Sequence, residues 1–338
     1  MKKLFCLFLA ALVVASSLAG CGGSPAASNN SSGASTSGIS AAPADFPNKS
    51  IRVIVPFAAG GNTDLNARSI ADIIQRNNLL PQPMVVTNIA GSNSMEGLNA
   101  LRTADADGYT LICQNTSYML AGNAMGTVTI NYPDMVPVAE VSTQPCVILV
   151  SGDSPFNTVD DLLEYAKAHP GELNFGFVGS GSTTHLAAEI FMDKSGSKGL
   201  FKMVSYTSGA DALTAQLGGN CEVRSSTAVD CARYVQSGEL KALVVTCENE
   251  TFPDVPTFTS LGYETEFAIR QGFFAPKGTP DAVVEILYKA IAEACAAEDY
   301  ASFCATNAMN VSDLSGADWV PLLDTDQTYM NEIVKGLS

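Results

Sequence analysis

The chain has 338 residues, of which 46% are apolar and 15% are charged, so we expect one or two globular domains with a sizeable core. Its formal net charge is −16 at pH 7. This acidity argues against binding to nucleic acid or to an anionic membrane surface, because few cations are available to neutralise phosphates. It argues only weakly against a small anionic ligand, which feels local dipoles in a cleft more than net charge.

The first residues predict export and lipid attachment. A basic start at residues 1–3 precedes an apolar run over 4–15, which fits a signal peptide and is short for a membrane span. The small residues before Cys21 resemble a bacterial lipobox, so we predict a signal peptide over 1–20 and lipidation of Cys21. The alternative is an ordinary signal peptide with an incidental cysteine. Residues 21–45 are rich in Gly, Ser and Ala, which predicts a flexible tether. This protein would sit on the outer face of the bacterial cell membrane.

Strand-like apolar runs alternate with helical patterns from residue 50 onward. The alternation predicts an α/β fold with a mainly parallel sheet, divided into two similar lobes. The expected strands are 51–57, 83–88, 109–113, 146–151, 174–178, 204–206, 240–246 and 267–275. The expected helices are 65–77, 94–102, 159–168, 185–194, 211–217 and 280–296.

Seven cysteines lie in the body of the chain, with no C-x-x-C pair and only two histidines in the sequence. This argues against zinc, and we predict no metal and no cofactor. An odd number of cysteines outside the cytoplasm argues against a full disulfide framework, so buried thiols are the simpler expectation. A single bridge between Cys295 and Cys304 stays open.

Polar, glycine-bearing turns open three of the expected helices, at residues 60–64, 179–184 and 206–209. A helix N-terminus has unpaired backbone N–H groups and a partial positive charge, and glycine lets a ligand approach the backbone. Such turns can hold an anion without lysine or arginine. The alternative for each single turn is a plain strand-to-helix connection, with Asp64 and Ser182 or Thr183 as helix caps.

Three other interpretations of these turns fail on spacing. The first turn lacks the lysine of a nucleoside-triphosphate loop, and neither of the first two turns has the G-x-G-x-x-G pattern of a dinucleotide site. The residues around Ser180 do not match the G-x-S-x-G elbow of an α/β-hydrolase. A local pair of Ser182 and His185 has no evident third member, which leaves a hydrolase as the weakest alternative.

Several motifs, in this order, resemble the substrate-binding proteins of tripartite tricarboxylate transporters, the Bug family. The resemblance covers the whole mature chain. The matching segments are 51–64, 67–68, 106–111, 179–187 with Glu189, 206–210, 217–219, 253–257, 262–263 and 274–280.

The resemblance implies a type II periplasmic-binding-protein fold, with two α/β lobes, a hinge and a cleft. Lobe 1 would comprise 46–146 and 267–338, and lobe 2 would comprise 147–266. A carboxylate would be held by backbone groups and water, with Asp64 orienting a bridging water. The implied ligand-binding residues are Phe57, Ala59, Gly60, Gly61, Asn62, Thr63 and Asp64 on one side, and Ser182, Thr183, Ser208 and Gly209 on the other.

The implied function is capture of a small di- or tricarboxylate and its delivery to permease subunits, without catalysis and as a monomer. A module that feeds a membrane sensor is the alternative. The sequence departs from the family after Gly219, where residues 221–226 replace the usual aspartate and apolar pair. Arg224 in this segment is then either a solvated surface charge or a cation that faces the cleft and pairs with a second carboxylate.

Overall fold

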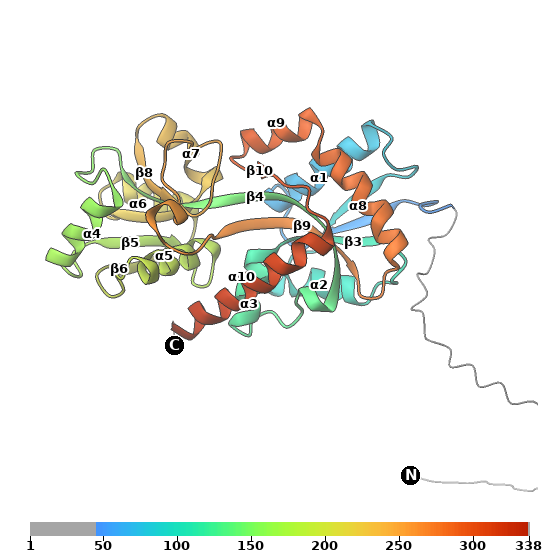
Figure 1. Ribbon diagram of the computed structural model, residues 1–338, viewed down its shortest axis with the longest axis horizontal. Helices are drawn as coiled ribbons and strands as arrows, with labels where there is room; N and C mark the ends of the chain where they lie inside the picture. The colour runs from blue at the N-terminus through green and yellow to red at the C-terminus, as the bar shows by residue number, and fades with distance from the viewer. Residues whose placement is uncertain (1–44, 337–338) are drawn as a thin grey trace, which may run out of the picture. The chain divides into compact units, whose positions relative to one another are not determined.

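The computed structural model describes residues 45–336, so the predicted signal peptide, lipidation site and nearly all of the tether lie outside the described part. Figure 1 shows helices arranged around a strongly curved sheet. No helix among the described residues is long and apolar enough to span a membrane. No group of metal-ligating side chains occurs within the same residues.

The described part contains ten strands and ten α-helices. The strands are β1 (Ile51–Val55), β2 (Met84–Asn88), β3 (Thr110–Asn115), β4 (Met135–Ser151), β5 (Asn174–Val178), β6 (Lys202–Tyr206), β7 (Val223–Thr227), β8 (Leu240–Val245), β9 (Ala268–Pro276) and β10 (Asn310–Val311). The helices are α1 (Asn62–Arg76), α2 (Met95–Arg102), α3 (Thr116–Ala124), α4 (Val159–Ala168), α5 (Thr183–Lys194), α6 (Gly209–Leu217), α7 (Ala228–Gln236), α8 (Asp281–Cys295), α9 (Glu298–Thr306) and α10 (Gly316–Gly336).

The sheet is continuous and mixed. Its order is β2-β1-β3-β9-β4-β7-β5-β6, and β8 and β10 also pair with β4. Pairs within β1–β3 and within β5–β7 are parallel, as expected, but every pair that involves β4 or β9 is antiparallel. The α/β class is therefore confirmed, whereas the expectation of a mainly parallel sheet holds only for the two ends.

Strand β4 joins the two ends of the sheet. It begins at Met135, not at the expected residue 146, and its first part pairs with β9 as far as Pro145. From Cys146 onward it pairs with β7 and β8. The early part escaped prediction because Pro137 and Pro145 weaken a strand pattern, and a register shift follows Pro137.

Six other elements were missed for related reasons. Strand β7 has the polar sequence Val-Arg-Ser-Ser-Thr, yet four of its five residues are buried. Helix α10 contains Pro321, which breaks the helical pattern. Helices α3, α7 and α9 have only nine residues each, and β10 has two, too few for a strong period.

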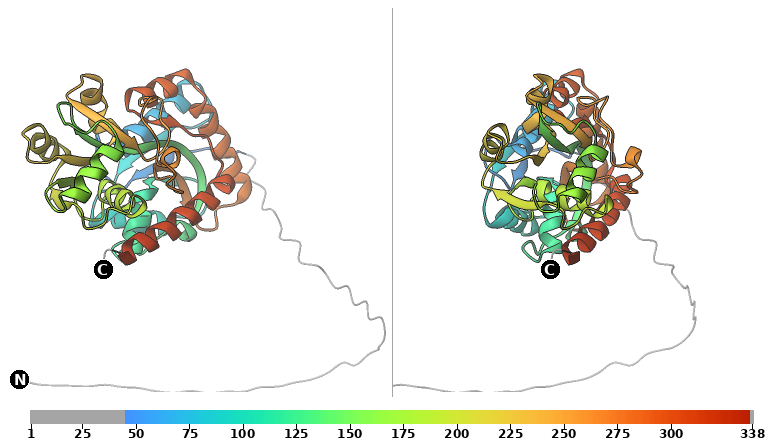
Figure 2. Two further views of the ribbon diagram at one scale, coloured as in Figure 1. Left: turned by 60° about the vertical axis from the view of Figure 1, so that its left-hand side comes forward. Right: turned by 90° about the vertical axis from the view of Figure 1, so that its left-hand side faces the viewer.

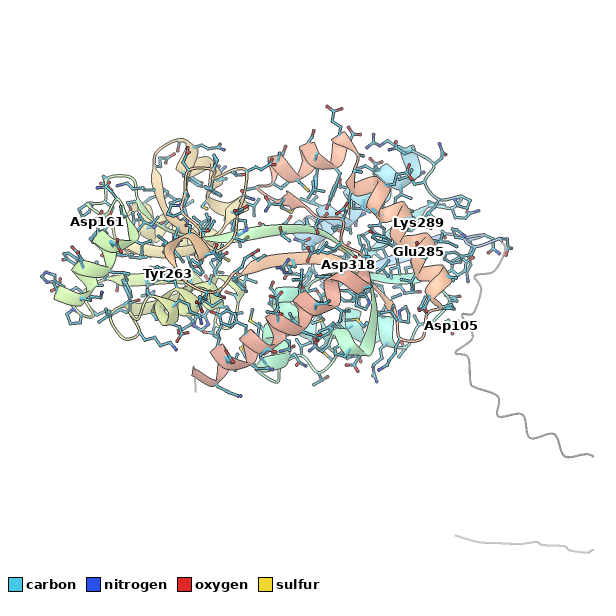
Figure 3. All side chains as sticks on the ribbon, viewed as in Figure 1. Asp105, Asp161, Tyr263, Glu285, Lys289 and Asp318 are labelled. Carbon is cyan, nitrogen blue, oxygen red and sulfur yellow. The ribbon has the colours of Figure 1, made fainter. Side chains whose placement is uncertain are left out.

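Local signals fix the helix ends that were predicted well. Thr158 and Asp161 form a reciprocal capping box at the start of α4, in which each side chain accepts a hydrogen bond from the other residue's backbone N–H. Figure 3 labels Asp161 there. On α8, the exposed side chains of Glu285 and Lys289, both labelled in Figure 3, pair one turn apart at 3.1 Å.

The C-terminal helix α10 packs on β4 and contacts both α3 and α5. Figures 1 and 2 show it alongside α3. Its Trp319 is fully buried and lies on Phe274, with ring centroids 4.8 Å apart. Gly272 of β9 makes this contact possible, because a Cβ there would lie 2.4 Å from the Trp319 ring.

All seven cysteines of the described part are free and buried, including Cys295 and Cys304, so the bridge that the sequence left open is absent. Burial raises the pKa of the Cys231 and Cys247 thiols to about 12. The buried thiols therefore stay protonated and act as small apolar side chains.

A buried amide ties four elements together. Asn66 of α1 is fully buried, and its Nδ2 donates to Ser142 Oγ of β4 at 2.7 Å and to Gln271 Oε1 of β9 at 3.0 Å. Its Oδ1 accepts from the hydroxyl of Tyr300 in α9 at 2.7 Å. One side chain therefore satisfies three buried polar groups, which would each be costly to leave unpaired.

We expect Asn66→Ala to lower the free energy of unfolding by about 3 kcal/mol, because the substitution leaves those buried polar partners without their hydrogen bonds. Denaturant titration of the purified protein measures the change. Asn99→Ala on the surface of α2 is the matched control and should change stability by less than about 0.5 kcal/mol. Equal effects of the two substitutions would contradict a structural role for the Asn66 network.

Candidate functional site

The first glycine turn leads from β1 into an uncapped helix. Gly60 adopts a φ of +80°, which favours glycine, and no atom lies within 4 Å of its Cβ position. Gly61 occupies the N-cap position of α1 and offers no side-chain acceptor. The first N–H groups of α1 therefore lack a side-chain cap, which leaves the positive end of the helix available to an anion.

Asp64 holds this turn in place. Its side chain is 2% exposed, and its Oδ2 accepts from the Gly60 backbone N–H at 2.8 Å. Arg68 Nε donates to both carboxylate oxygens at 3.0 Å, and Asn88 Nδ2 donates to Oδ1 at 2.9 Å. Asn88 also donates to the Phe57 carbonyl at 3.1 Å. The carboxylate is thus fully engaged within the protein, and Asp64 shapes the turn.

These bonds decide the charge state of Asp64. Burial opposes ionisation, but the hydrogen bonds from Arg68, Gly60 and Asn88 outweigh it and lower the pKa of the carboxyl below its ordinary value of 3.8. The turn is therefore held by a carboxylate that is ionised at neutral pH. Sequence reasoning singled out Asp64 but missed Asn88, which is the last residue of β2 and carries no motif of its own.

Asn62, the first residue of α1, has an unsatisfied side chain. Both its Nδ2 and its Oδ1 are buried, and neither has a hydrogen-bond partner. A buried amide normally finds partners, so this side chain marks a place where a ligand or a bound water is expected. Phe57, between β1 and the first glycine turn, meets Tyr118 of α3 edge-on, with ring centroids 5.7 Å apart.

The second turn precedes α5 and is capped. Ser182 Oγ accepts from the His185 backbone N–H at 3.2 Å and bonds with Thr184 Oγ1 at 3.0 Å. The Gly181 N–H donates to His185 Nδ1 at 3.0 Å, and the imidazole stacks on Phe177 at 4.2 Å. Nδ1 is therefore already occupied as an acceptor.

This geometry counts against the hydrolase alternative. The bonds of the Ser182 hydroxyl go to Thr184 and to a backbone N–H, and the Nδ1 of His185 is taken by Gly181. A nucleophile must be within hydrogen-bond reach of its base, and no such bond joins the two side chains.

The third turn, before α6, carries its own negative charge. Ser208 Oγ accepts from the Asp211 N–H at 3.1 Å and donates to Asp211 Oδ2 at 2.8 Å, and Thr207 donates to the same oxygen. These hydroxyl bonds lower the pKa of Asp211. An ionised carboxylate in the first turn of α6 makes this helix a weaker anion site than α1.

Residues at the two ends of α3 contact the regions of the first and second turns. Phe57 contacts Tyr118 near the start of α3, and Gly181 faces Met125 just past its end. A Cβ on Gly181 would lie 2.4 Å from the Met125 methyl carbon. The predicted residues of the third turn contact a different neighbour, since the Cβ position of Gly209 lies 3.5 Å from Asp230.

Arg224 is buried in β7 and is 1% exposed, so the interpretation as a solvated surface charge is wrong. Sequence reasoning missed this because β7 is polar and was not recognised as a strand.

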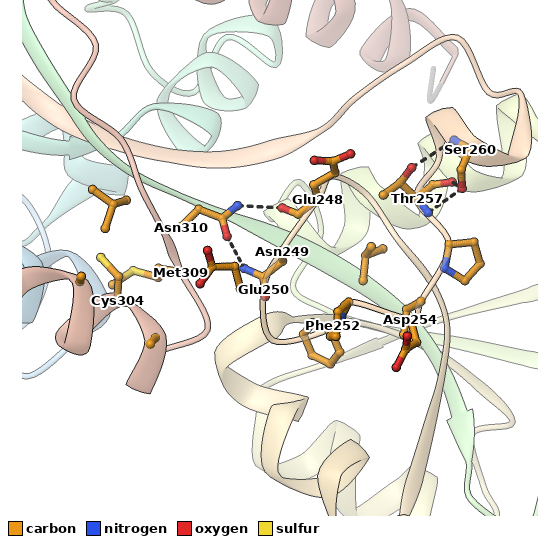
Figure 4. A pocket seen from close by; sticks show the side chains of 17 residues that line it. Glu248, Asn249, Glu250, Phe252, Asp254, Thr257, Ser260, Cys304, Met309 and Asn310 are labelled. Atoms are coloured by element: carbon orange, nitrogen blue, oxygen red, sulfur yellow. Dashed lines mark hydrogen bonds between the residues drawn. The ribbon is translucent and has the colours of Figure 1, made fainter.

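Two cavities lie away from the glycine turns. One of about 830 Å³ is bordered by residues 245–260 and 301–311, and Figure 4 shows the Asn249–Asn310 bond across it. Its charged lining consists of Glu248, Glu250 and Asp254, which does not favour a carboxylate. The other, of about 610 Å³, lies beside α10. Neither is lined by any of the predicted ligand-binding residues.

Comparison with known proteins adds the following similarities. The profile of the TctC family, described as the tripartite tricarboxylate transporter family receptor, matches residues 66–338. A UPF0065 protein of Bordetella pertussis is 32% identical over 294 residues, which cover 86% of this chain and 90% of that protein.

Two solved structures cover the same share of the chain. A TctC solute-binding protein from Polaromonas, crystallised without ligand, superposes with a TM-score of 0.78 at 29% identity, covering 86% of this chain and 99% of that one. MatC from Rhodopseudomonas palustris with bound malate superposes with a TM-score of 0.67 at 25% identity, covering 86% and 100%. The predicted periplasmic-binding-protein fold is thereby confirmed.

We expect Asp64→Asn to destabilise the protein at pH 7 by about 2 kcal/mol, because it removes charge-assisted hydrogen bonds. Since the pKa of Asp64 is lowered on folding, its stabilising effect is present above pH 3.8 and is lost as the pH falls through the folded-state pKa.

Thermal denaturation of the native protein and of Asp64→Asn, from pH 7 to pH 2.5, should therefore show their difference in stability disappearing below about pH 4. Asp72→Asn, an exposed carboxylate on the same helix, serves as the control and should show a much smaller difference. If the stability loss caused by Asp64→Asn did not change with pH, an ionised Asp64 would not be what stabilises the turn.

Proposed function

Since the chain belongs to the receptor family of the tripartite tricarboxylate transporters, we propose that it is an extracytoplasmic receptor that captures a small carboxylate and delivers it to the membrane permease of such a transporter. Proteins of this family are substrate-binding receptors, so the prediction that the chain is not an enzyme is confirmed.

The observation that carries the ligand proposal is the start of α1. There an uncapped helix N-terminus coincides with the unpartnered amide of Asn62. A carboxylate at this point would accept from the first N–H groups of α1 and from Asn62 Nδ2, and the Asp64 network keeps the backbone open to it. A neutral ligand would gain less from the helix dipole, so the geometry favours an acid.

The second side of the proposed site is formed by Ser182 and Thr183 at the start of α5, with Ser208 and Gly209 in a secondary role. The change of partners of β4 between Pro145 and Cys146 supports a hinge there, with lobes over 46–146 and 267–338 and over 147–266. Closure about this hinge would be favoured by the ligand because both helix termini contact it only when closed. MatC, which binds malate, supports a small organic acid as the ligand.

We expect malate or a related acid, at one hundred times its dissociation constant, to stabilise the protein by about 2.7 kcal/mol, a rise of a few degrees in the melting midpoint. Thermal-shift measurements with a panel of carboxylates and their uncharged amides test this. Asn62→Ala should weaken the shift at least several-fold, whereas the surface control Asn99→Ala should preserve it. Shifts with amides but with none of the acids would overturn the carboxylate proposal.

The attachment proposal rests on the first residues of the sequence, where Cys21 follows small residues and precedes a tether. Lipid on Cys21 would hold the receptor at the outer face of the membrane, close to its permease. Diffusion along the membrane would then replace diffusion through a larger volume, which raises the effective concentration at the permease. We propose that the receptor works as a monomer.

We expect Cys21→Ser to release the protein from the membrane fraction of the native host into the soluble fraction. Cys6→Ser, within the expected signal peptide, should leave the distribution unchanged. Immunoblots of fractionated cells measure both. Membrane retention of the Cys21→Ser protein would show that it is not anchored through this residue.

A further inference from the structure

Arg224 carries a buried charge without an ionic partner. It lies in β7, where its Nε donates to Gln216 Oε1 of α6 at 2.9 Å and its Nη1 donates to Ser226 Oγ at 3.2 Å. Nη2 is buried and has no hydrogen-bond partner. Among the described residues no carboxylate forms an ion pair with it.

The other buried arginine behaves as usual. Arg270 of β9 is 8% exposed and pairs with Glu140 at 3.3 Å and with Asp326 at 3.1 Å. Burying a cation costs several kcal/mol unless a partner compensates it. Arg224 bonds only to neutral oxygens, so it lacks the carboxylate partners that compensate the charge of Arg270.

The surroundings of Arg224 come from α6 and α7, two helices that contact β7. The side chain lies on the face of the sheet covered by α6 and α7, and its neighbours include the thiols of Cys221 and Cys231. Asp230, in the first turn of α7, is within electrostatic range. Its Oδ2, however, accepts from Thr227 Oγ1 and lies against Gly209, the first residue of α6.

A purely structural role does not explain this residue. An apolar side chain of similar volume would pack in this position without a desolvation cost and would often be more stable. A guanidinium with a free, desolvated N–H is suited to a carboxylate, which accepts from two donors of the planar fork. The bonds to Gln216 and Ser226 hold that fork in a fixed orientation.

We propose that Arg224 is the specificity-determining residue for a second acidic group of the ligand, with Nη2 as the donor that this group fills. The inference rests on the proposed function and narrows it to dicarboxylates. The first carboxylate binds at the start of α1, and the second accepts from Nη2 of Arg224. Burial lowers the pKa of the free guanidinium, and a bound carboxylate would restore its ordinary stability as a cation.

The test compares matched acids that differ in one carboxylate. Isothermal titration calorimetry of the purified protein uses malate against 2-hydroxybutanoate and succinate against butanoate. The native protein should bind the dicarboxylates at least tenfold more tightly. Arg224→Met should lose at least tenfold in affinity for the dicarboxylates while its affinity for the monocarboxylates changes less than threefold. The affinity of Arg224→Lys for the dicarboxylates should lie between those of the native protein and Arg224→Met, because lysine keeps the charge without the planar fork.

Arg233→Gln is the matched control, because it removes an exposed cation from α7 and should change neither class. Circular dichroism checks the fold of each variant, and Arg224→Gln replaces Arg224→Met if the latter does not fold. If Arg224→Met lost equal affinity for dicarboxylates and monocarboxylates, or kept the native preference for dicarboxylates, the proposed role of Arg224 would be overturned. A native protein that binds both classes equally would also overturn it while leaving the receptor function intact. Failure of the native protein to bind any acid would instead count against the proposed function.

Discussion

The antiparallel pairing of β4 with β9 is the constraint on which the rest of this molecule depends. Each end of the sheet is built from short parallel strands, and only this pair connects them. Asn66 joins α1 to both strands by hydrogen bonds, and Trp319 fixes α10 across Gly272. Strand β4 alone continues from this pairing into the other end of the sheet, where it pairs with β7 and β8.

Charge is distributed unevenly among the three turns, and this gives them different roles. At α1 the negative charge of Asp64 is turned inward and neutralised by Arg68, so the helix end remains open to an anion. At α6 Asp211 supplies the anion itself. At α5 a neutral serine caps the helix and leaves a polar but uncharged surface. A protein with a net charge of −16 can therefore still attract an acid, because local dipoles at one uncapped helix decide the sign of the field.

The sequence predicted the α/β class and nearly all of the strands and helices that carry an apolar period. It also located the glycine turns, because glycine, serine and aspartate have strong local preferences. It could not predict the burial of Arg224, since β7 shows no apolar pattern and burial depends on α6 and α7 packing over it. Nor could it predict that Asn88 holds Phe57 and Asp64, because that contact joins residues 24 and 31 positions apart. The length of β4 was hidden by two prolines that the structure accommodates within the pairing.

The single tryptophan of the chain is a built-in optical reporter of one part of the structure. Trp319 is fully shielded from solvent and contacts Phe274 and the backbone of β9. A change in its emission on adding a solute therefore signals a rearrangement of β9 and α10, and not contact with the solute at the glycine turns. Intrinsic fluorescence can thus follow movement of the connecting strands separately from occupancy, which calorimetry measures.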